Sequence, residues 1–455
     1  MIETAELTAQ AEHLDIHMSN VQRDYVFGWL LAGIYGSSRL GDTLVLKGGN
    51  AFRKAYIPET RFSDDLDFST SAAVDPDFLI RELNAVCQLV QSETGVAFDV
   101  DRNRVVGEQR IDDAKRVFKL KLYFKDFVGG ADHITISVRV DVTELDRLYL
   151  PIQSRRLIHP YSDAPECSVE IRCAKLEELF ADKLKCLLQR RYSYDLFDLS
   201  YGLFIRNDLA VDRREIMSVF LRKTIFEPSP VAAKELLVAL PLALFRGFWN
   251  KVICPARSRI SFDSAVEVFM RGVEGLFAPF SYGSGATLAY FPSDLRNPIM
   301  EAATTLSTLE ITYQGVVREV EPYSLIFKRK KDGSAREYFY GWDLTGGHRS
   351  GPGIKALVPE NFQAIKVTTR KFAPRFAVEL SKAGDVTMTG SFPGPTGSVA
   401  IRQPRARAGA PTPVYIVECA SCGKRFRRSR PDARVNAHQD NYGNPCFGRS
   451  GVRVF

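Results

Sequence analysis

Residues 64–69 of this chain read DDLDFS, and no other stretch limits its fold as strongly. In a strand, residues two apart lie on one face, so Asp65 and Asp67 share a face while the apolar residues between them point to the core. Two carboxylates on one face of a half-buried strand repel each other unless a cation lies between them. Mg²⁺ or Mn²⁺ prefers such oxygen ligands, so the pattern predicts a metal site. Asp64 faces the other way and is expected in solvent.

A glycine pair precedes this strand. Lys47, Gly48 and Gly49 end the strand-like TLVLKGG and open the helix-like AFRKAY. Glycines permit close backbone approach and helix N-termini favour anions, so the segment suits a phosphate. A tight turn without a ligand is the alternative. Further along, Asp141 in VRVDVT faces opposite three valines, so it is either a third carboxylate on the metal face or an ordinary strand-edge aspartate.

The hydrophobic period changes along the chain. Residues 19–40 have helical spacing, and strand-like stretches follow up to residue 143: TLVLKGG, DDLDFST, VAFDVDR, RVFKLKLYF and HITISVRVDVT. From Ala174 the spacing is helical again to about residue 278, including KELLVALPLALFRGFWNKVI and SAVEVFMRGVEGLF. This order predicts an α+β fold in which a mixed domain is followed by a helical region.

Two ordered motifs carry a resemblance to a known family. The glycine pair followed by Arg61, Ser63, Asp65, Leu66, Asp67 and Phe68 resembles the nucleotidyltransferase motif of the DNA polymerase-β superfamily, and more closely the AbiEii/AbiGii toxin family. A second family block appears as Glu177, Glu178, Ala181, Asp182, Lys183, Leu184, Arg190, Asp195, Leu196, Asp198 and Leu199. Together the blocks cover roughly residues 40–205.

The resemblance implies a polymerase-β-like core that transfers a nucleotide from a nucleoside triphosphate. Asp65 and Asp67 would bind Mg²⁺ or Mn²⁺, Lys183 would neutralise phosphates, and the remaining nucleotide contacts would come from Lys47, Gly48, Gly49, Ser63 and Arg190. Asp195 and Asp198 would hold the base, the acceptor or Lys183 itself. Asp141 belongs to neither motif and joins the candidate catalytic residues only through its position on its strand. A surface lysine is the alternative for Lys183. Some family members add nucleotides to the 3′ ends of tRNA, and the toxins pair with a separate antitoxin protein in toxin–antitoxin or phage-defence systems.

Composition suggests the domain boundaries. We expect a transferase core over residues 1–205, a helical extension over 206–280, a β domain over 294–380, a Gly/Pro/Ser/Arg-rich linker over 381–412 and a small module over 413–455. The β domain resembles the SH3-like WYL domain through Arg318, Glu321, Pro322, Tyr323 and Leu325, with Tyr338, Phe339 and Tyr340 in place of Trp-Tyr-Leu. That resemblance implies a nucleic-acid or nucleotide ligand; a purely structural aromatic core is the alternative.

The C-terminal module combines metal-ligand spacing with positive charge. Cys419 and Cys422 form a CxxC pair, and His438 and Cys446 follow, which predicts a closed structural Zn²⁺ site rather than a redox pair. Residues 401–455 contain eleven Lys/Arg against three Asp/Glu, a formal charge of +8, whereas the whole chain carries +7. The basic loop with Arg425, Arg427, Arg428 and Arg430 is therefore expected to contact nucleic acid, with a solvated loop as the alternative.

These features favour one function over another. We expect a metal-dependent nucleotidyltransferase toxin that modifies RNA and has an antitoxin partner; the alternative is a nucleic-acid-sensing regulator whose transferase core is only a scaffold. The acidic N-terminus lacks an apolar signal core and no apolar run reaches the ~20 residues of a membrane span, so we expect a cytoplasmic protein without a membrane partner. The five scattered cysteines are expected as small buried residues rather than disulfides.

Overall fold

The computed structural model describes residues 2–110, 116–128, 134–280, 289–329, 335–346, 351–375, 378–380, 415–422, 425–428, 432–439 and 445–453. The chain divides into two compact units, Met1–Ser398 and Val399–Phe455. A search of the described helices finds none with the length and apolar character needed to cross a membrane. Within these described ranges no disulfide joins two cysteines, and four of the five scattered cysteines are buried, as expected, while Cys186 is partly exposed.

A seven-stranded mixed sheet forms the first half of the larger unit. Its strands lie in the order β3-β4-β5-β2-β1-β7-β6, with β2 parallel to β5, β1 parallel to β7 and the other neighbours antiparallel. Their bounds are β1 Val45–Lys47, β2 Asp65–Ser69, β3 Arg104–Arg110, β4 Arg116–Lys125, β5 Thr135–Thr143, β6 Gln153–Arg156 and β7 Glu170–Cys173. Strands β1 and β2 pair with each other and lie between β5 and β7, so the DDLDFS strand is at the centre of the sheet.

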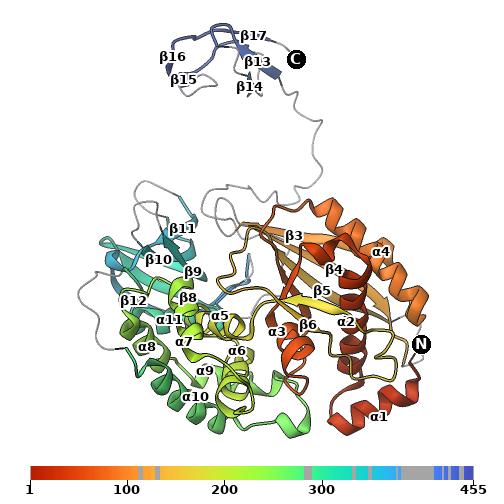
Figure 1. Ribbon diagram of the computed structural model, residues 1–455. Helices are drawn as coiled ribbons and strands as arrows, with labels where there is room; N and C mark the ends of the chain where they lie inside the picture. The colour runs from red at the N-terminus through yellow and green to blue at the C-terminus, as the bar shows by residue number, and fades with distance from the viewer. Residues whose placement is uncertain are drawn as a thin grey trace. The chain divides into compact units, whose positions relative to one another are not determined.

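Helices cover this sheet where the sequence is apolar. The predicted helix over 19–40 is α2 (Met18–Ser37), which is buried along most of its length. It lies beside α4 (Pro76–Thr94), whose apolar residues face the core, and α1 (Thr4–Leu14) packs on it (Figure 1). Between β1 and β2, α3 (Gly48–Ala51) continues into η2, a π-helix (Phe52–Tyr56).

The helical region begins where the period changes, at α5 (Leu176–Gln189). It continues through α6 Ser193–Phe197, η4 (a π-helix) Asp198–Ile205, α7 Arg213–Lys223, α8 Pro230–Val238, α9 Ala243–Arg246 and α10 Phe262–Phe277, with short 3₁₀ turns η5 Trp249–Lys251 and η6 Ala256–Ser258. The stretch 234–253, expected to be helical, is helical only in pieces (α8, α9 and η5): α8 ends at Val238, because Pro241 cannot continue a helical hydrogen-bond ladder.

The strand expected in VAFDVDR (residues 96–102) is also wrong. Phe98 forms only an isolated bridge with Phe124, and η3 (Val100–Arg102) is a 3₁₀ turn. The Gln91 side chain of α4 accepts the Phe98 backbone N–H at 2.9 Å. Two backbone hydrogen bonds, from Asp99 N–H to the Tyr123 carbonyl and from Lys125 N–H to the Ala97 carbonyl, join the segment to β4 without a longer strand ladder.

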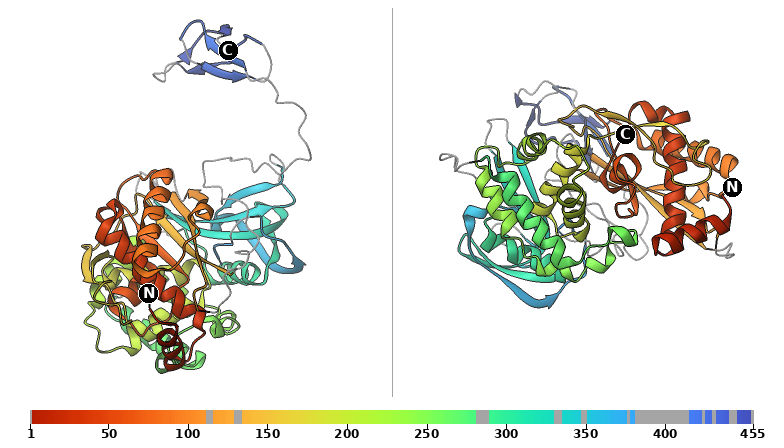
Figure 2. Two further views of the ribbon diagram at one scale, coloured as in Figure 1. Left: turned by 90° about the vertical axis from the view of Figure 1, so that its right-hand side faces the viewer. Right: turned by 60° about the horizontal axis from the view of Figure 1, so that its bottom comes forward.

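A second sheet follows, with its own hydrophobic core. Its order is β11-β10-β9-β8-β12, all antiparallel, from β8 Ser307–Tyr313, β9 Val316–Arg329, β10 Ala335–Asp343, β11 Gly353–Leu357 and β12 Phe362–Lys371, with the 3₁₀ turn η7 at Pro359–Asn361. Helix α11 (Ser293–Thr305) packs against β8, β9 and β12 (Figure 2). The stretches ITYQGVVREVEPYSLIF, REYFYGWD and FQAIKVTT, which the sequence predicts as strands, lie in β8 to β10 and β12. The Gln189 side chain of α5 donates to the Leu325 carbonyl at 3.0 Å.

The smaller unit holds two short sheets in its described part. Strands β13 Tyr415–Cys419, β14 Arg425–Arg428 and β17 Gly451–Arg453 form one, in the order β14-β13-β17, and β15 His438–Gln439 pairs with β16 Pro445–Cys446. The second pairing sets His438 directly opposite Cys446.

Candidate active site

The sheet register gathers the acidic residues that the sequence singled out. Asp67 on β2 pairs across the parallel ladder with Asp141 on β5, and across the antiparallel ladder with Lys47 on β1. Asp141 in turn pairs with Lys119 on β4. Because neighbouring residues of adjacent strands lie on the same face, these four side chains form a row across one face of the sheet. Leu66 and Phe68, on the opposite face, are fully buried, as the alternation predicts.

Burial raises the pKa of both carboxylates in this row. Burial, reinforced by the charges of Asp65 and Asp141, raises the pKa of Asp67 to about 7. Burial likewise raises the pKa of Asp141 to about 6, with Lys119 acting against the shift and Asp65 acting with it. Carboxylates that are held together against such repulsion are a donor set suited to a hard divalent cation.

Asp65 is oriented by its neighbours. The Ser63 hydroxyl donates to Asp65 Oδ1 at 2.9 Å, and the Asn50 amide donates to the Asp65 carbonyl at 2.5 Å. Arg139 Nη2 lies 3.9 Å from Asp65 Oδ2. The predicted nucleotide contact Ser63 therefore lies beside the predicted metal ligand, and Asn50 joins the backbone of that ligand to α3.

The two glycines permit this close approach. Gly48 has φ of +69°, and a Cβ placed on it would lie 2.1 Å from Asp67 Oδ2. A Cβ on Gly49 would lie 2.6 Å from Ser63 Oγ. Any side chain at either position would displace the acidic site, so the glycine pair is explained first by packing against Asp67 and Ser63.

Two of the predicted residues have partners that the sequence did not reveal. Lys47 Nζ bonds Asp146 Oδ2 at 2.8 Å and Thr143 Oγ1 at 3.1 Å, so the lysine already has a carboxylate partner. Asp64, expected in solvent, forms an ion pair with Arg23 at 2.7 Å and has a half-exposed side chain. Arg23 belongs to α2, and the alternation of residues within the strand could not predict this contact with a distant helix.

The second family block builds a buried ion network. Lys183 Nζ lies 2.9 Å from Asp195 Oδ1 and 2.7 Å from Asp198 Oδ2, so the surface-lysine alternative is wrong. Arg190 binds both oxygens of Asp195, at 2.7 and 3.0 Å, and Arg61 binds both oxygens of Asp198, each at 2.8 Å. Burial favours the neutral amine, but the two carboxylates outweigh it and raise the pKa of Lys183.

Two cavities meet at the carboxylate row. Cavity A, about 180 Å³, is lined on its own side by Gly49, Arg61, Ser63, Asp65, Tyr192 and Tyr194, with Phe62 and Arg139 beside them. Cavity B, about 560 Å³, is lined on its own side by Lys47, Gly48, Arg147, Tyr149, Lys185 and Arg222. Both are bordered by Asp67, Lys119, Asp141, Lys183, Arg190 and Glu379. A molecule in either cavity would therefore reach the same carboxylates.

Several of these residues were missed at the level of sequence. The alternation of RVFKLKLYF could have placed Lys119 on the polar face of its strand. Tyr192 and Tyr194 lie between the motif residues Arg190 and Asp195. No sequence spacing distinguishes a tyrosine that stacks on a ligand from an ordinary one. Glu379 follows β12, far beyond the motifs; the Arg191 backbone N–H donates to the next residue, Leu380, at 2.9 Å, which brings this segment to the site.

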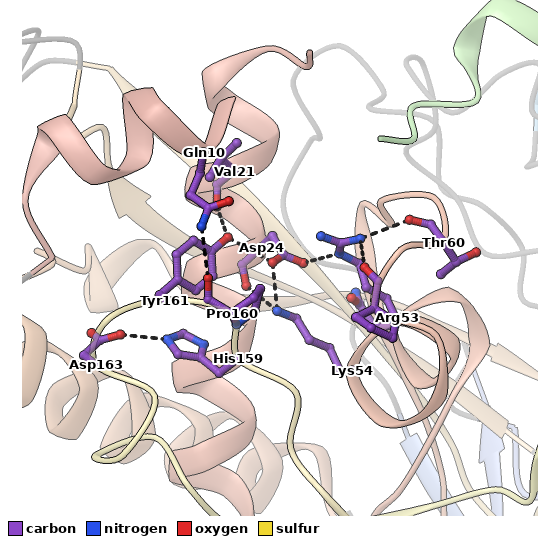
Figure 3. Close-up of polar contacts among 12 residues, drawn as sticks. Gln10, Val21, Asp24, Arg53, Lys54, Thr60, His159, Pro160, Tyr161 and Asp163 are labelled. Carbon is purple, nitrogen blue, oxygen red and sulfur yellow. Dashed lines mark hydrogen bonds and ion pairs between the residues drawn. The ribbon is translucent and has the colours of Figure 1, made fainter. Parts of the chain in front are cut away.

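A second buried network supports the loop that leads into the site. Arg53 and Lys54, on η2, both point to Asp24 on α2, at 2.7 and 2.9 Å (Figure 3). The Arg53 guanidinium also donates to the carbonyls of Pro58 and Thr60, at 2.6 and 3.0 Å. These bonds fix the chain immediately before Arg61, so the network positions the loop without lining either cavity.

The predicted zinc ligands come together in the smaller unit. The ligand atoms of Cys419, Cys422, His438 and Cys446 all lie within 4.8 Å of one another. Cys422 Sγ is 3.2 Å from His438 Nε2, and His438 Nδ1 lies 2.8 Å from the Asn436 carbonyl. Three thiols and one imidazole whose second nitrogen is held by a backbone carbonyl fit a tetrahedral Zn²⁺. Of the predicted arginines, three lie on β14 (Arg425, Arg427 and Arg428), and Arg430 is outside the described residues.

A comparison with protein families gives a match over the part of the chain that contains the carboxylate row. The family model "Nucleotidyl transferase AbiEii toxin, Type IV TA system" matches residues 29–253. Among solved structures, MenT4, a nucleotidyltransferase toxin from Mycobacterium tuberculosis H37Rv, is 19% identical, with 61% of this chain and 99% of that chain covered and a TM-score of 0.37. A second solved structure, described as a nucleotidyltransferase from H. pylori, is 14% identical, with 59% of this chain and 100% of that chain covered and a TM-score of 0.37. No curated protein matches the sequence.

Proposed function

We propose that this chain, a nucleotidyltransferase of the toxin type by its family match over residues 29–253, transfers a nucleoside monophosphate from a nucleoside triphosphate to the 3′ hydroxyl of an RNA. The observation that carries the proposal is the direct pairing of Asp67 with Asp141 where the two cavities meet, beside the ammonium of Lys183. One cavity can then hold the nucleotide and the other the acceptor.

Cavity A suits the nucleotide. Tyr192 and Tyr194 line this space with an arginine guanidinium over each ring, Arg190 at 4.4 Å and Arg61 at 4.7 Å. A base would stack on this layer of rings and guanidiniums, with Gly49 and Ser63 beside it. Lys183, held by its two aspartates, presents a fixed positive charge to the phosphates. A divalent cation bound by Asp65 and Asp67 would clamp the triphosphate and offset charge on the leaving pyrophosphate.

Asp141 is suited to accept the proton. The acceptor oxygen forms a bond to the α-phosphorus while the bond from that phosphorus to pyrophosphate breaks, and the hydroxyl proton must leave. A carboxylate whose pKa is raised to about 6 by burial is a better proton acceptor than an ordinary aspartate, while remaining mostly ionised at neutral pH.

The remaining assignments complete the proposal. The AbiEii description names a type IV toxin–antitoxin system, so a cognate antitoxin protein is the expected partner. We assign residues 294–380 to a WYL-like β domain and the cysteine cluster to a structural Zn²⁺ site that stabilises a basic, nucleic-acid-binding module. Backbone amides of Ser421 and Cys422 help to lower the pKa of Cys419 to about 6, which favours the metal-binding thiolate.

The direct test is incubation of the purified protein with each labelled nucleoside triphosphate, Mg²⁺ and total tRNA. We expect label at the RNA 3′ end, lost in Asp65→Ala and retained in Asp208→Ala, an exposed aspartate that lines neither cavity. Undiminished incorporation by Asp65→Ala would refute the assignment of the metal site. The same label on protein instead of RNA would identify a different acceptor.

A further inference from the structure

Cavity B contains an arginine clamp whose ligand is not accounted for by the nucleotide site. The guanidiniums of Arg147 and Arg222 both lie against the ring of Tyr149, 4.8 and 4.6 Å from its centroid. Neither forms an ion pair with a carboxylate in the part of the chain that the structure describes. Stacking on an aromatic ring orients the planar guanidinium and leaves its N–H groups available to an anion.

Arg147 and Arg222 are themselves exposed, but the backbone segments that carry the clamp are held by a buried carboxylate. The buried carboxylate of Glu178 accepts the backbone N–H groups of Tyr149, at 3.0 and 3.1 Å, and of Leu150, at 2.8 Å. The same carboxylate pairs with Lys223 at 2.6 Å, the neighbour of Arg222 at the end of α7. Glu178 belongs to the second family block, so this motif residue holds both sides of the clamp together.

The setting of the clamp indicates a phosphate ligand. Lys119 and Lys185 line the same cavity, which opens onto Asp67 and Asp141. Lys47 lines it too, but its charge is already paired with Asp146. Guanidinium groups match phosphate oxygens in a two-pronged geometry, and several cations around one cavity attract a multiply charged anion more than a single carboxylate.

The position of cavity B distinguishes the acceptor from the nucleotide. In-line transfer requires the attacking oxygen and the leaving pyrophosphate to lie on opposite sides of the α-phosphorus. Cavity A has the stacking rings, Gly49 and Ser63, whereas cavity B has the clamp and is the larger of the two. With the nucleotide bound in cavity A, cavity B is the space in which the acceptor would bind.

We propose that cavity B binds the phosphodiester backbone of the acceptor strand next to its 3′ end, with Arg147 and Arg222 on successive phosphates and Tyr149 as their platform. The proposal rests on the proposed function for the order of the two cavities. It adds that the acceptor is selected as a phosphate-bearing strand, so a protein hydroxyl or a neutral small molecule would not be used.

The test measures binding and transfer separately in the full-length protein. The variant Arg147→Gln/Arg222→Gln is compared with Arg81→Gln/Arg271→Gln, which removes two exposed arginines that line neither cavity. Binding of a ten-nucleotide single-stranded RNA with a free 3′ hydroxyl is followed by fluorescence anisotropy across a salt series, without nucleoside triphosphate. Transfer is followed as KM for the RNA and KM for the nucleotide.

For the clamp variant we expect binding weaker by about tenfold per arginine and a salt slope reduced by roughly 1.4, the value for two lost phosphate contacts on a single strand. KM for RNA should rise while KM for the nucleotide stays unchanged, and the control should match the wild type. Arg147→Lys/Arg222→Lys keeps the charge but not the planar fork, so it should recover the salt slope and only part of the affinity.

Other outcomes would overturn the proposal. A raised KM for the nucleotide with unchanged RNA binding would make cavity B the triphosphate site. Equal losses of RNA affinity in the clamp and control variants would show that RNA responds only to general surface charge and that Arg147 and Arg222 form no specific site. If the wild type binds RNA through the clamp but transfers no nucleotide to it, the proposed function fails while the binding site remains.

Discussion

Replacing Asp67 with asparagine should stabilise the metal-free protein while abolishing transfer. Burial and the charges of Asp65 and Asp141 raise the pKa of Asp67 to about 7 from an ordinary 3.8. Each tenfold change in proton affinity corresponds to 1.36 kcal/mol, so the charged form costs the folded state about 4 kcal/mol. The substituted amide would carry no charge but would still lie beside two carboxylates, so we expect about half of this, roughly 2 kcal/mol, as a gain in unfolding free energy.

The sign depends on pH. Because the folded pKa lies above the unfolded one, the native state retains a proton that the unfolded chain has lost between about pH 4 and about pH 7. The contribution of Asp67 to stability therefore falls as pH rises through this window and is lowest above it. The difference between Asp67→Asn and the wild type should be small near pH 4.5 and should reach its full value near pH 8.

Urea unfolding in EDTA at about pH 5 and about pH 8 measures this difference, with Asp64→Asn as the matched control. Asp64 is next to the same strand but has Arg23 as a partner, so its variant should gain nothing at either pH. Mg²⁺ should stabilise the wild type at about pH 8 and leave Asp67→Asn unaffected. An Asp67→Asn protein that is no more stable than the wild type at about pH 8 would refute the account of the site as electrostatically strained.

Three further changes test other parts of the structure. Gly48→Ala should abolish transfer with only a modest loss of stability, because the new methyl group would overlap the Asp67 carboxylate; wild-type activity would show that the close approach is not required. Lys183→Met leaves two buried carboxylates without their shared cation, so thermal unfolding should reveal a loss of about 3–5 kcal/mol, and a loss below about 1 kcal/mol would contradict the buried network. Cys419→Ser should lower zinc content to near zero by elemental analysis while the transferase retains its melting transition; unchanged zinc would rule out the cluster as the site.

The sequence was most informative about features that depend on a single strand, such as which face of the strand each side chain occupies. Alternation within DDLDFS was enough to predict that Leu66 and Phe68 are buried, although not that Ser69 is, and alternation within VRVDVT predicted that Asp141 lies on the face opposite the valines. That Asp141 lies directly beside Asp67 depends on the parallel pairing of two strands separated by a helix and two other strands. No local pattern contains that register.

The clamp shows why the remainder of the site was not predicted. Arg147 and Tyr149 follow β5, Arg222 lies near the end of α7, and Glu178 lies on α5, so three separate segments must fold before any contact exists. Each residue alone is ordinary in its own segment. Glu379 is a similar case, since backbone hydrogen bonds of Leu380 with Arg191 and Tyr323 hold its segment beside the cavities.

The pairing of β2 with β5 also has a consequence for the kinetics of folding. This parallel contact joins distant parts of the chain, and such contacts form late because the loop between them must first be closed. The repulsion between Asp67 and Asp141 therefore arises only near the end of folding, after most of the core has been buried. A cation that binds between them can act only on the finished sheet, so Mg²⁺ should slow unfolding while leaving the refolding rate nearly unchanged.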